Sequence, residues 1–226
     1  MIVRQPVWGV LPVKPFASAK KRLTAILDAT DRARLARAMF EDVLAALIDC
    51  RTLEGVVVVT ADGDAAAIAR QAGALVLDES VALGVNAALL DAIAYLSATN
   101  DAGMIMVPSD LPQLSANAIE CAIERIDAPA AIALQRASDG GTNLFACRPA
   151  GIIPPSFGAG SFDAHCAAAR RTGLVPRVIE WPGLEHDLDR PDDLPAFLSL
   201  RTPTRSHAFV AQALNRGMMS RAIVSI

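Results

Sequence analysis

The sequence predicts an α/β domain, a three-layer α/β/α sandwich around a mostly parallel sheet. Short apolar runs alternate along the chain with segments of helical periodicity. Several runs, such as residues 56–59 and 104–107, are apolar at every position, which is typical of strands covered by helices on both faces. The length of 226 residues suits one large domain with a substantial core.

Seven short apolar runs are the predicted strands. Each is short enough for a buried strand and is flanked by residues that favour turns or helix starts. The predicted strands cover residues 7–13, 55–60, 74–77, 103–107, 130–134, 144–147 and 175–180.

Six segments between or after these runs are the predicted helices. In residues 31–49, Leu35, Met39 and Val43 belong to one apolar stripe, and Thr30 is the expected N-cap. The other predicted helices cover residues 64–72, 85–97, 116–126 behind Ser115, 163–172 and 192–200.

The chain changes character after residue 200. Residues 201–226 contain four arginines and no acidic residue. We therefore predict a domain at 1–200 and a basic tail at 201–226, which is an appendage or an oligomer contact. A helix around residues 209–214 would pack on the body or on a second subunit, and fraying is the alternative.

Composition and charge narrow the class of partner. The formal charge is −3, and no broad basic field suits nucleic acid, so small ligands are expected. No stretch is apolar for long enough to span a bilayer, so no membrane partner is expected. The four cysteines are far apart, which suggests neither a zinc site nor a disulfide framework and fits a reducing cytoplasm.

Asp110 follows the predicted strand 103–107 directly. Pro108 and Pro112 on either side stiffen the loop. A carboxylate fixed at the carboxyl end of a strand is well placed to bind Mg²⁺, which takes oxygen ligands and few protein carboxylates. The alternative is a turn aspartate that hydrogen-bonds its own loop.

A second acidic run follows the last predicted strand. In an extended segment Asp187 and Asp189 would lie on one side, so both could face the same site as Asp110. Asp192 and Asp193 fall in a first helical turn, where capping explains them.

Four cations cluster after the first predicted strand, namely Lys14, Lys20, Lys21 and Arg22. A basic loop beside acidic metal ligands suits a nucleoside triphosphate, because cations neutralise the charge on the phosphates. A solvated basic surface is the alternative. Neither a P-loop nor a Gly-x-Gly-x-x-Gly fingerprint is present.

Two glycine-rich turns are candidate anion sites. Residues 139–143 would present backbone N–H groups to an anion, although a hairpin turn is the competing interpretation. Residues 157–162 lead into a helix N-terminus, where Ser161 could be a plain N-cap. His165 on that helix is interpreted as a structural or substrate-positioning residue rather than a base.

Together these segments resemble the guanylyltransferase family of coenzyme F420 biosynthesis, the 2-phospho-L-lactate guanylyltransferases and their phosphoenolpyruvate and 3-phosphoglycerate homologues. The matching runs recur in order from near residue 7 to about residue 200. They are LPVKP (11–15), AKKRL (19–23), LGVNAAL (83–89), PSDLP (108–112), DGGTN (139–143), GAGSF (158–162) and DLD (187–189).

The resemblance implies the nucleotidyltransferase fold of the molybdenum-cofactor and sugar enzymes. It implies Mg²⁺-dependent transfer of GMP from GTP to 3-phospho-D-glycerate, phosphoenolpyruvate or 2-phospho-L-lactate, with release of pyrophosphate. A homodimer, and transfer of the labile product to the next enzyme of the pathway, are further expectations.

The resemblance also implies roles for individual residues. Asp110 and Asp189 would bind the metal, with Asp187 as the close alternative to Asp189. The remaining positions are Lys14, Lys20 and Arg22 as catalytic residues on the triphosphate, Gly84 and Asn86 on the guanosine side, and Thr142, Gly158 and Ser161 on the phosphorylated acid.

Two departures from the family pattern bear on the acceptor. Ser109 stands where alanine is usual, and Arg190 stands where threonine often follows the last aspartate. Arg190 could reach a carboxylate or phosphate. The rival functions are a nucleotidyltransferase of the molybdopterin or sugar type, a glycosyltransferase, and a nucleotide-binding module without catalysis.

Overall fold

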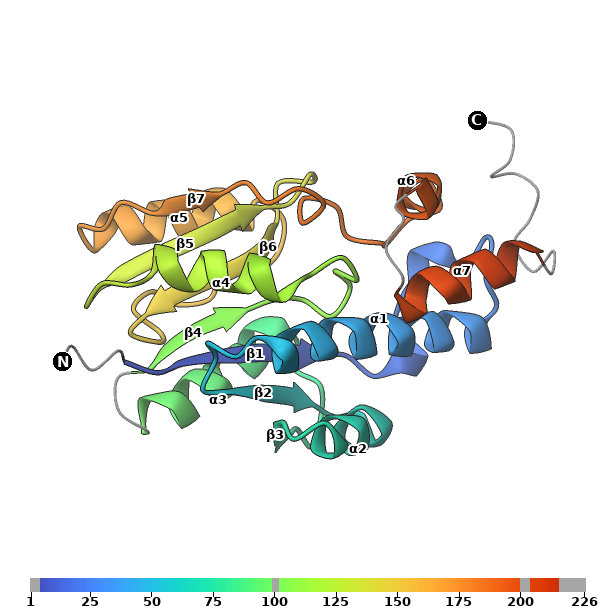
Figure 1. The fold of residues 1–226 in the computed structure, drawn as a ribbon, viewed down its shortest axis with the longest axis horizontal. Coiled ribbons are helices and arrows are strands. Elements are labelled where there is room, and N and C mark those ends of the chain that lie inside the picture. The colour runs from blue at the N-terminus through green and yellow to red at the C-terminus, as the bar shows by residue number, and fades with distance from the viewer. Residues whose placement is uncertain (1–4, 99–101, 200–203, 216–226) are drawn as a thin grey trace.

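One seven-stranded sheet organises the computed structural model, which describes residues 5–98, 102–199 and 204–215. Its strand order is β3-β2-β1-β4-β6-β5-β7 (Figure 1). The strands are β1 (Val7–Val13), β2 (Gly55–Thr60), β3 (Leu75–Asp78), β4 (Gly103–Met106), β5 (Ala131–Arg136), β6 (Thr142–Arg148) and β7 (Arg177–Ile179). Of the seven strands in the described residues, only β6 runs antiparallel to its neighbours, so the predicted mostly parallel sheet is confirmed.

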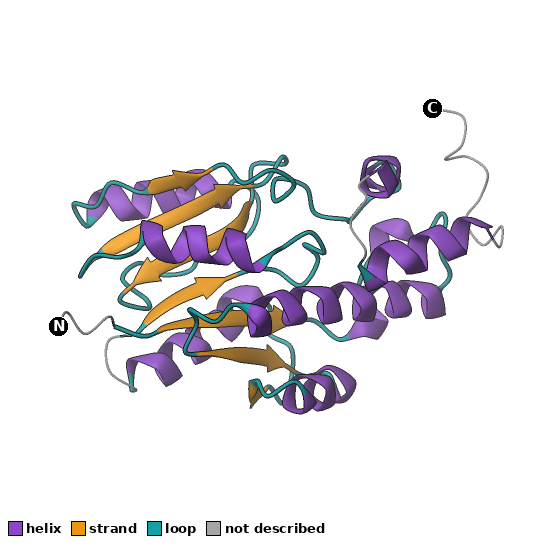
Figure 2. Ribbon diagram, in the orientation of Figure 1, coloured by secondary structure: helices purple, strands orange, loops and turns teal. Residues whose placement is uncertain are grey.

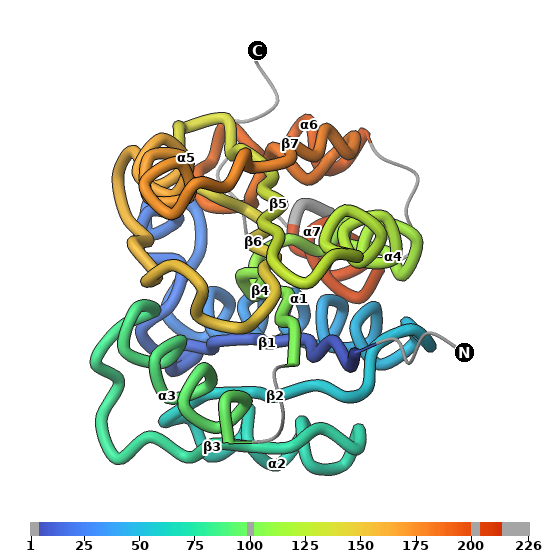
Figure 3. Tube along the Cα trace, turned by 90° about the vertical axis from the view of Figure 1, so that its left-hand side faces the viewer, coloured from blue at the N-terminus to red at the C-terminus, as the bar shows by residue number. Residues whose placement is uncertain are grey.

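Helices cover both faces of this sheet. The helices are α1 (Ala29–Asp49), α2 (Gly63–Gln71), α3 (Val85–Ser97), α4 (Ala116–Arg125), α5 (Ser161–Arg171), α6 (Asp193–Ser199) and α7 (Arg205–Asn215). The core on one face takes residues from α1, α2 and α4, and the core on the other takes residues from α3 and α5. Figures 2 and 3 show the resulting three layers.

Strand β1 shows why this arrangement follows from the sequence. Its side chains alternate between the two cores, with Leu11 in one and Val10 in the other. Both residues are fully buried. A strand with apolar residues at every position therefore needs helices on both of its faces.

Helices α1 and α5 each start two residues earlier than predicted. The N-cap of α1 is Asp28, whose carboxylate accepts a hydrogen bond from the Asp31 N–H at 2.8 Å, whereas Thr30 is already helical. Helix α5 starts at Ser161, not at residue 163, and its N-cap is Gly160 in a left-handed conformation. Ser161 is thus the first helical residue and not the N-cap.

The predicted strand at residues 175–180 is too long. Strand β7 is an edge strand that pairs only with β5 over three residues. Val175 lies outside the pairing and is 86% exposed. Val175 is therefore an apolar residue that belongs neither to a strand nor to the core. For this reason hydrophobicity alone predicts a strand that is longer than β7.

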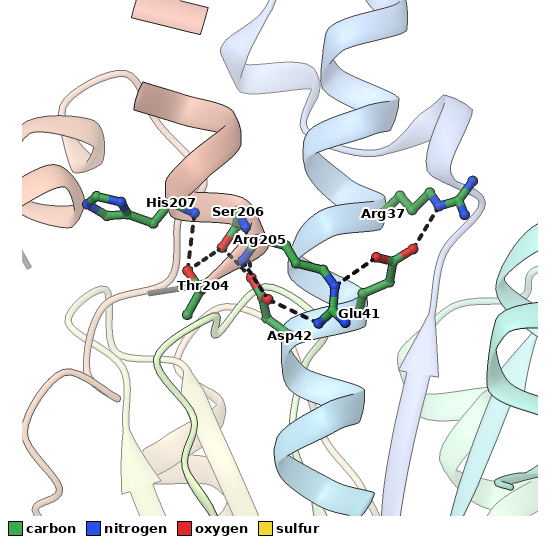
Figure 4. Close-up of polar contacts among 7 residues, drawn as sticks. All are labelled: Arg37, Glu41, Asp42, Thr204, Arg205, Ser206 and His207. Atoms are coloured by element: carbon green, nitrogen blue, oxygen red, sulfur yellow. Dashed lines mark hydrogen bonds and ion pairs between the residues drawn. The ribbon is translucent and has the colours of Figure 1, made fainter. Parts of the chain in front are cut away.

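Helix α7 begins at Arg205, earlier than the predicted 209, and packs on α1 and α6 in a third core cluster. Asp42 of α1 caps α7: its two carboxylate oxygens accept from the Arg205 and Ser206 N–H groups, each at 2.9 Å. Glu41 pairs with Arg205 as well, and Figure 4 shows these contacts. The first part of the tail is therefore tied to the body of the chain.

The same third cluster contains residues that precede and follow the candidate site. It includes Leu23 and Leu27 after the basic loop, and Leu188 between the two late aspartates. Helices α6 and α7 lie beyond the carboxyl ends of the strands (Figure 1). Among the described residues, none of the helices is both apolar and long enough to cross a membrane.

Candidate active site

A cavity of about 630 Å³ opens at the carboxyl edge of the sheet. The parallel strands β1 and β4 both end there, and the segments that follow them carry the basic loop and Asp110. Every predicted site residue lines this cavity except Asn86. The lining set is Lys14, Lys20, Arg22, Gly84, Asp110, Thr142, Gly158, Ser161, Asp187 and Asp189.

The basic loop after β1 is anchored to the body through one backbone N–H group. It forms two short 3-10 turns, η1 (Phe16–Ser18) and η2 (Lys21–Leu23). The Phe16 N–H donates to the Asp62 carboxylate at 2.8 Å. Between the turns Lys20 adopts a left-handed conformation with φ 52°, which is uncommon for a residue with a side chain and marks a constrained position.

Lys20 is the centre of the ion-pair network. The residue is only 8% exposed. Its Nζ lies 2.9 Å from an Asp110 oxygen and 3.6 Å from an Asp189 oxygen. The other oxygen of Asp189 lies 2.7 Å from an Arg22 nitrogen. Residues from three distant parts of the chain therefore meet at one point.

The two aspartate loops are also joined through their backbones. The Leu188 N–H donates to the Asp110 carbonyl at 3.3 Å. One oxygen of Asp193 accepts from the N–H groups of Asp189 and Arg190, at 2.8 and 2.6 Å. Asp193 is the first residue of α6, but its donors precede the helix, so its carboxylate holds the turn that presents Asp189.

Asp187 is a third carboxylate beside this pair. Burial raises its pKa, and the charge of Asp110 raises it further. Lys20 acts in the opposite direction. The half-buried carboxyl thus senses the same charges as the other two aspartates.

Asp110 and Asp189 fit the needs of a divalent cation. Mg²⁺ usually takes one or two protein carboxylates and completes its shell with water and phosphate oxygens. Both carboxylates already face one cationic group, the Lys20 ammonium. Within the described residues no group of three or more His, Cys, Asp or Glu side chains could by itself hold a metal ion. A cation bound to Asp110 and Asp189 would therefore need further oxygen ligands from water or from phosphate groups.

The side of the cavity near α3 contains Gly84 and a residue the sequence did not indicate, Glu79. Gly84 has φ 99° and ψ 169°, a region open essentially to glycine alone. Burial raises the pKa of Glu79, as does the charge of Asp91. No motif marked Glu79, because only the path of the chain after β3 brings it to the cavity.

Asn86 does not line the cavity but hydrogen-bonds Phe157, in the loop across the cavity from α3. Its amide nitrogen donates to the Phe157 carbonyl at 3.1 Å, and its amide oxygen accepts from the Phe157 N–H at 2.8 Å. Both functional groups of the side chain are therefore engaged with the loop that precedes α5.

The far side of the cavity combines β6 with the start of α5. The Ser161 hydroxyl donates to the Thr142 hydroxyl oxygen at 3.1 Å, and His165 Nδ1 lies 3.1 Å from the same oxygen. Residues 137–141 form the hairpin turn between β5 and β6, closed by the Ala137 N–H and the Gly141 carbonyl at 2.9 Å. Asp139 and Gly141 nevertheless line the cavity.

Of the two departures noted in the sequence, only one reaches the cavity. Ser109 is a lining residue. Arg190 is exposed and is not among the lining residues.

Comparison with known proteins places the chain among guanylyltransferases. Residues 8–213 match the family described as "Guanylyl transferase CofC like". The chain is 38% identical over 195 residues to a phosphoenolpyruvate guanylyltransferase of Roseiflexus castenholzii, covering 83% of this chain and 86% of that protein. It is 34% identical over 188 residues to a 3-phospho-D-glycerate guanylyltransferase of Phenylobacterium zucineum, covering 82% and 86%.

A solved structure supports the fold. The chain superposes with a TM-score of 0.73 on a crystal structure from Desulfovibrio desulfuricans G20, described as a candidate nucleotide-diphospho-sugar transferase. The match covers 92% of this chain and 95% of that one at 17% identity. The predicted nucleotidyltransferase fold is thereby confirmed.

Proposed function

The chain belongs to the CofC-like guanylyl transferase family, and we propose that it transfers GMP from GTP to a small phosphorylated carboxylic acid in coenzyme F420 biosynthesis. The candidates for the acceptor are phosphoenolpyruvate, 3-phospho-D-glycerate and 2-phospho-L-lactate. Relatives named for the first two match most of the chain. The observation that carries the proposal is the convergence of Lys20, Asp110 and Asp189 on the floor of one cavity.

In this proposal the two ends of the cavity hold the two substrates. Gly84 and Asn86 are assigned to the guanosine side, although the Asn86 side chain hydrogen-bonds Phe157 in the loop that leads to the opposite wall. The phosphorylated acid lies against the opposite wall, which contains Thr142, Gly158 and Ser161. The α-phosphorus then lies between them, near the ion-pair network.

The reaction needs positioning and charge neutralisation more than a base. An anionic oxygen of the acceptor phosphate attacks the α-phosphorus, a new P–O bond forms, and the bond to the β-phosphate oxygen breaks to release pyrophosphate. The attacking oxygen is already deprotonated at neutral pH, so no residue must remove a proton. Lys14, Lys20 and Arg22 would hold the triphosphate and neutralise the charge that develops on the leaving pyrophosphate.

We propose Mg²⁺ as the cofactor, held by Asp110 and Asp189 with Asp187 as the alternative second ligand. A bound divalent cation would stabilise negative charge on the phosphate oxygens. Lys20 contacts both carboxylates. In this scheme its ammonium group also interacts with the triphosphate.

A substrate screen tests the proposal. The protein is incubated with Mg²⁺, each of the four common NTPs and each of the three acceptors, and pyrophosphate release is followed. We expect turnover with GTP and at least one acceptor, and little with the other nucleotides. The absence of turnover with GTP and all three acceptors would contradict the proposal, whereas turnover with CTP or a sugar phosphate would favour a rival nucleotidyltransferase.

Three finer points are also proposals. We place the reaction in the cytoplasm, expect the labile product to pass to the next enzyme of the pathway, and retain a homodimer with residues 201–226 as a candidate contact. Residues 216–226 lie outside the described part of the chain. Sedimentation of the full chain and of a chain ending at residue 215, over a range of concentrations, tests the contact.

A further inference from the structure

His165 is a buried residue behind the wall assigned to the acceptor. It lies on α5, is fully buried, and is packed between the rings of Phe145 and Phe157, with both centroid distances 4.9 Å. The cavity is lined by Thr142 and Ser161 but not by His165. Whatever His165 does for a ligand, it must do through another residue.

The hydrogen bonds of His165 define its tautomer. The Ser156 backbone N–H donates to His165 Nε2 at 3.0 Å, so this ring nitrogen carries a lone pair. Burial lowers the pKa of His165 to about 4, and the ring is neutral at physiological pH. The single ring proton is therefore on Nδ1, which donates to the Thr142 hydroxyl oxygen 3.1 Å away.

The Thr142 hydroxyl then has only one function left. Its oxygen accepts from His165 and, at 3.1 Å, from the Ser161 hydroxyl. A hydroxyl oxygen has two lone pairs and one proton, so both lone pairs are in use. Within residues 5–98, 102–199 and 204–215 the remaining proton has no hydrogen-bond acceptor, and Thr142 lines the cavity.

We propose that His165 is a positioning residue which makes the Thr142 hydroxyl an obligate hydrogen-bond donor to an anionic oxygen of the acceptor. The inference rests on the proposed function, since it takes the phosphorylated acid as the ligand of this wall. A hydroxyl free to rotate could accept or donate. One that already accepts twice can only donate, and an anion offers only acceptors.

The same histidine ties this hydroxyl to the loop that closes the wall. Nε2 holds the backbone of Ser156, and the next residue, Phe157, is clamped by Asn86. Gly158 follows directly and lines the cavity. One buried ring thus sets both the direction of a donor and the position of the neighbouring backbone.

Two substitutions separate the functions of the two ring nitrogens. In His165→Asn the amide nitrogen lies close to the position of Nδ1 and can still donate to Thr142. In His165→Gln the amide oxygen lies close to the position of Nε2 and can still accept from Ser156, but the donor to Thr142 is lost. We expect His165→Gln to raise the KM for the acceptor about tenfold, with the KM for GTP within twofold of wild type, and His165→Asn to restore most of the acceptor affinity.

A double-mutant cycle with Thr142→Val distinguishes positioning from a purely structural role. We expect Thr142→Val to raise the acceptor KM by itself, and His165→Gln to add little in that background. A purely structural role would instead lower the apparent kcat, because less enzyme is folded, and would change the KM for GTP together with the KM for the acceptor. His165→Asn and His165→Gln would then have equal defects in activity. Equal defects, or an undiminished effect of His165→Gln beside Thr142→Val, would overturn the inference.

A measurement on the unmodified protein covers the case in which a variant does not fold. The chain has three histidines, so ¹⁵N-histidine labelling and long-range ¹H–¹⁵N NMR can identify the tautomer of His165. We expect the Nδ1–H tautomer, with a shift of the Nδ1 proton when acceptor is added and none with GTP alone. An Nε2–H tautomer would overturn the inference, whereas wild-type enzyme that turns over no acceptor would refute the proposed function instead.

Discussion

Asp110 combines two functions at the scale of a single residue. One of its oxygens pairs with Lys20 at 2.9 Å, and the same carboxylate is a proposed ligand of Mg²⁺. Replacement by asparagine keeps the shape of the side chain and removes the charge that both partners need. We expect Asp110→Asn to lower kcat/KM by about two orders of magnitude or more and to raise the Mg²⁺ concentration needed for half-maximal rate.

A nearby acidic residue provides the control for Asp110. Asp192 is exposed and does not line the cavity, so Asp192→Asn should leave activity within about twofold of wild type. If Asp110→Asn retained activity with an unchanged Mg²⁺ dependence, the metal assignment would be wrong.

His165 also makes the stability of the fold depend on pH. Its pKa is lowered from 6.5 to about 4 by burial, so between these values the unfolded chain binds more protons than the folded chain. Stability is therefore fully present above pH 6.5 and falls as the pH decreases toward 4. Between pH 7 and pH 5 this effect amounts to about 2 kcal/mol.

Urea unfolding at both pH values measures this dependence. Wild type and His165→Asn share every other titrating group, so the variant should lose about 2 kcal/mol less between pH 7 and pH 5. An identical pH dependence in both proteins would show that His165 titrates in the folded state as it does in the unfolded state.

For individual residues, the sequence predicts which side chains lie close together at the site but not which hydrogen bonds they make. Carboxylates and cations at the ends of predicted strands converge because parallel strands end at one edge of a sheet. The position of Glu79 at the cavity depends instead on the path of the loop after β3, and the hydrogen bonds of His165 depend on how α5 packs against β6. Such features arise from packing, and no periodicity in the sequence encodes them.

At the scale of elements, α7 depends on a cap supplied by another helix. Asp42 of α1 accepts from the Arg205 and Ser206 N–H groups and from the Ser206 hydroxyl (Figure 4). Loss of an N-cap typically costs about 1 kcal/mol, with a range of about 0.5–2. We expect Asp42→Ala to reduce the free energy of unfolding by about that amount, with little change in kcat.

The neighbouring Glu41 is the matched control for Asp42. It pairs with the exposed guanidinium groups of Arg37 and Arg205, and exposed ion pairs contribute little. Glu41→Ala should therefore cost clearly less than Asp42→Ala in the same urea unfolding experiment. Equal losses would mean that the capping contact does not stabilise α7.

Gly84 forms the entry to α3 in a backbone conformation that other residues avoid, with φ 99° and ψ 169°. An added Cβ would meet no neighbouring atom within 4 Å, so the cost of Gly84→Ala is backbone strain alone. We expect a loss of stability of about 1–3 kcal/mol and a raised KM for GTP. Gly63 at the start of α2 also has open space but no positive φ, so Gly63→Ala should be neutral or slightly stabilising.

Thermal unfolding and steady-state kinetics of the two alanine variants check this expectation. A Gly84→Ala protein as stable as Gly63→Ala would show that the turn before α3 can relax.

Element boundaries were predictable where one physical cause dominates. The bounds of β1, β2 and α3 agree with the prediction, because runs of buried apolar residues coincide with the regular structure. The start of α7 was missed since its cap, Asp42, is more than 160 residues away in the sequence. The 3-10 turns of the basic loop were missed because the anchoring carboxylate of Asp62 follows a different strand.

At the scale of the whole molecule, the cavity joins segments from both halves of the chain. Lys20 and Arg22 come from the loop after β1, whereas Asp189 comes from the segment before α6. The third core cluster connects the same regions through Leu23, Leu188 and α7. A ligand that bridges the cavity should therefore stabilise the whole fold and not one part of it.

Ligand-dependent thermal unfolding tests this coupling. A ligand at about 100 times its Kd adds about 2.7 kcal/mol to the stability of the folded state, which for a domain of this size raises Tm by roughly 5–10 °C. We expect a single cooperative transition shifted by GTP with Mg²⁺, and a smaller shift by GTP with EDTA. In Asp110→Asn the Mg²⁺-dependent part should disappear while a part due to Lys14 and Arg22 remains. A Mg²⁺-dependent shift that survives in this variant, or a transition that splits into two, would contradict the view that one metal-dependent site joins the two halves.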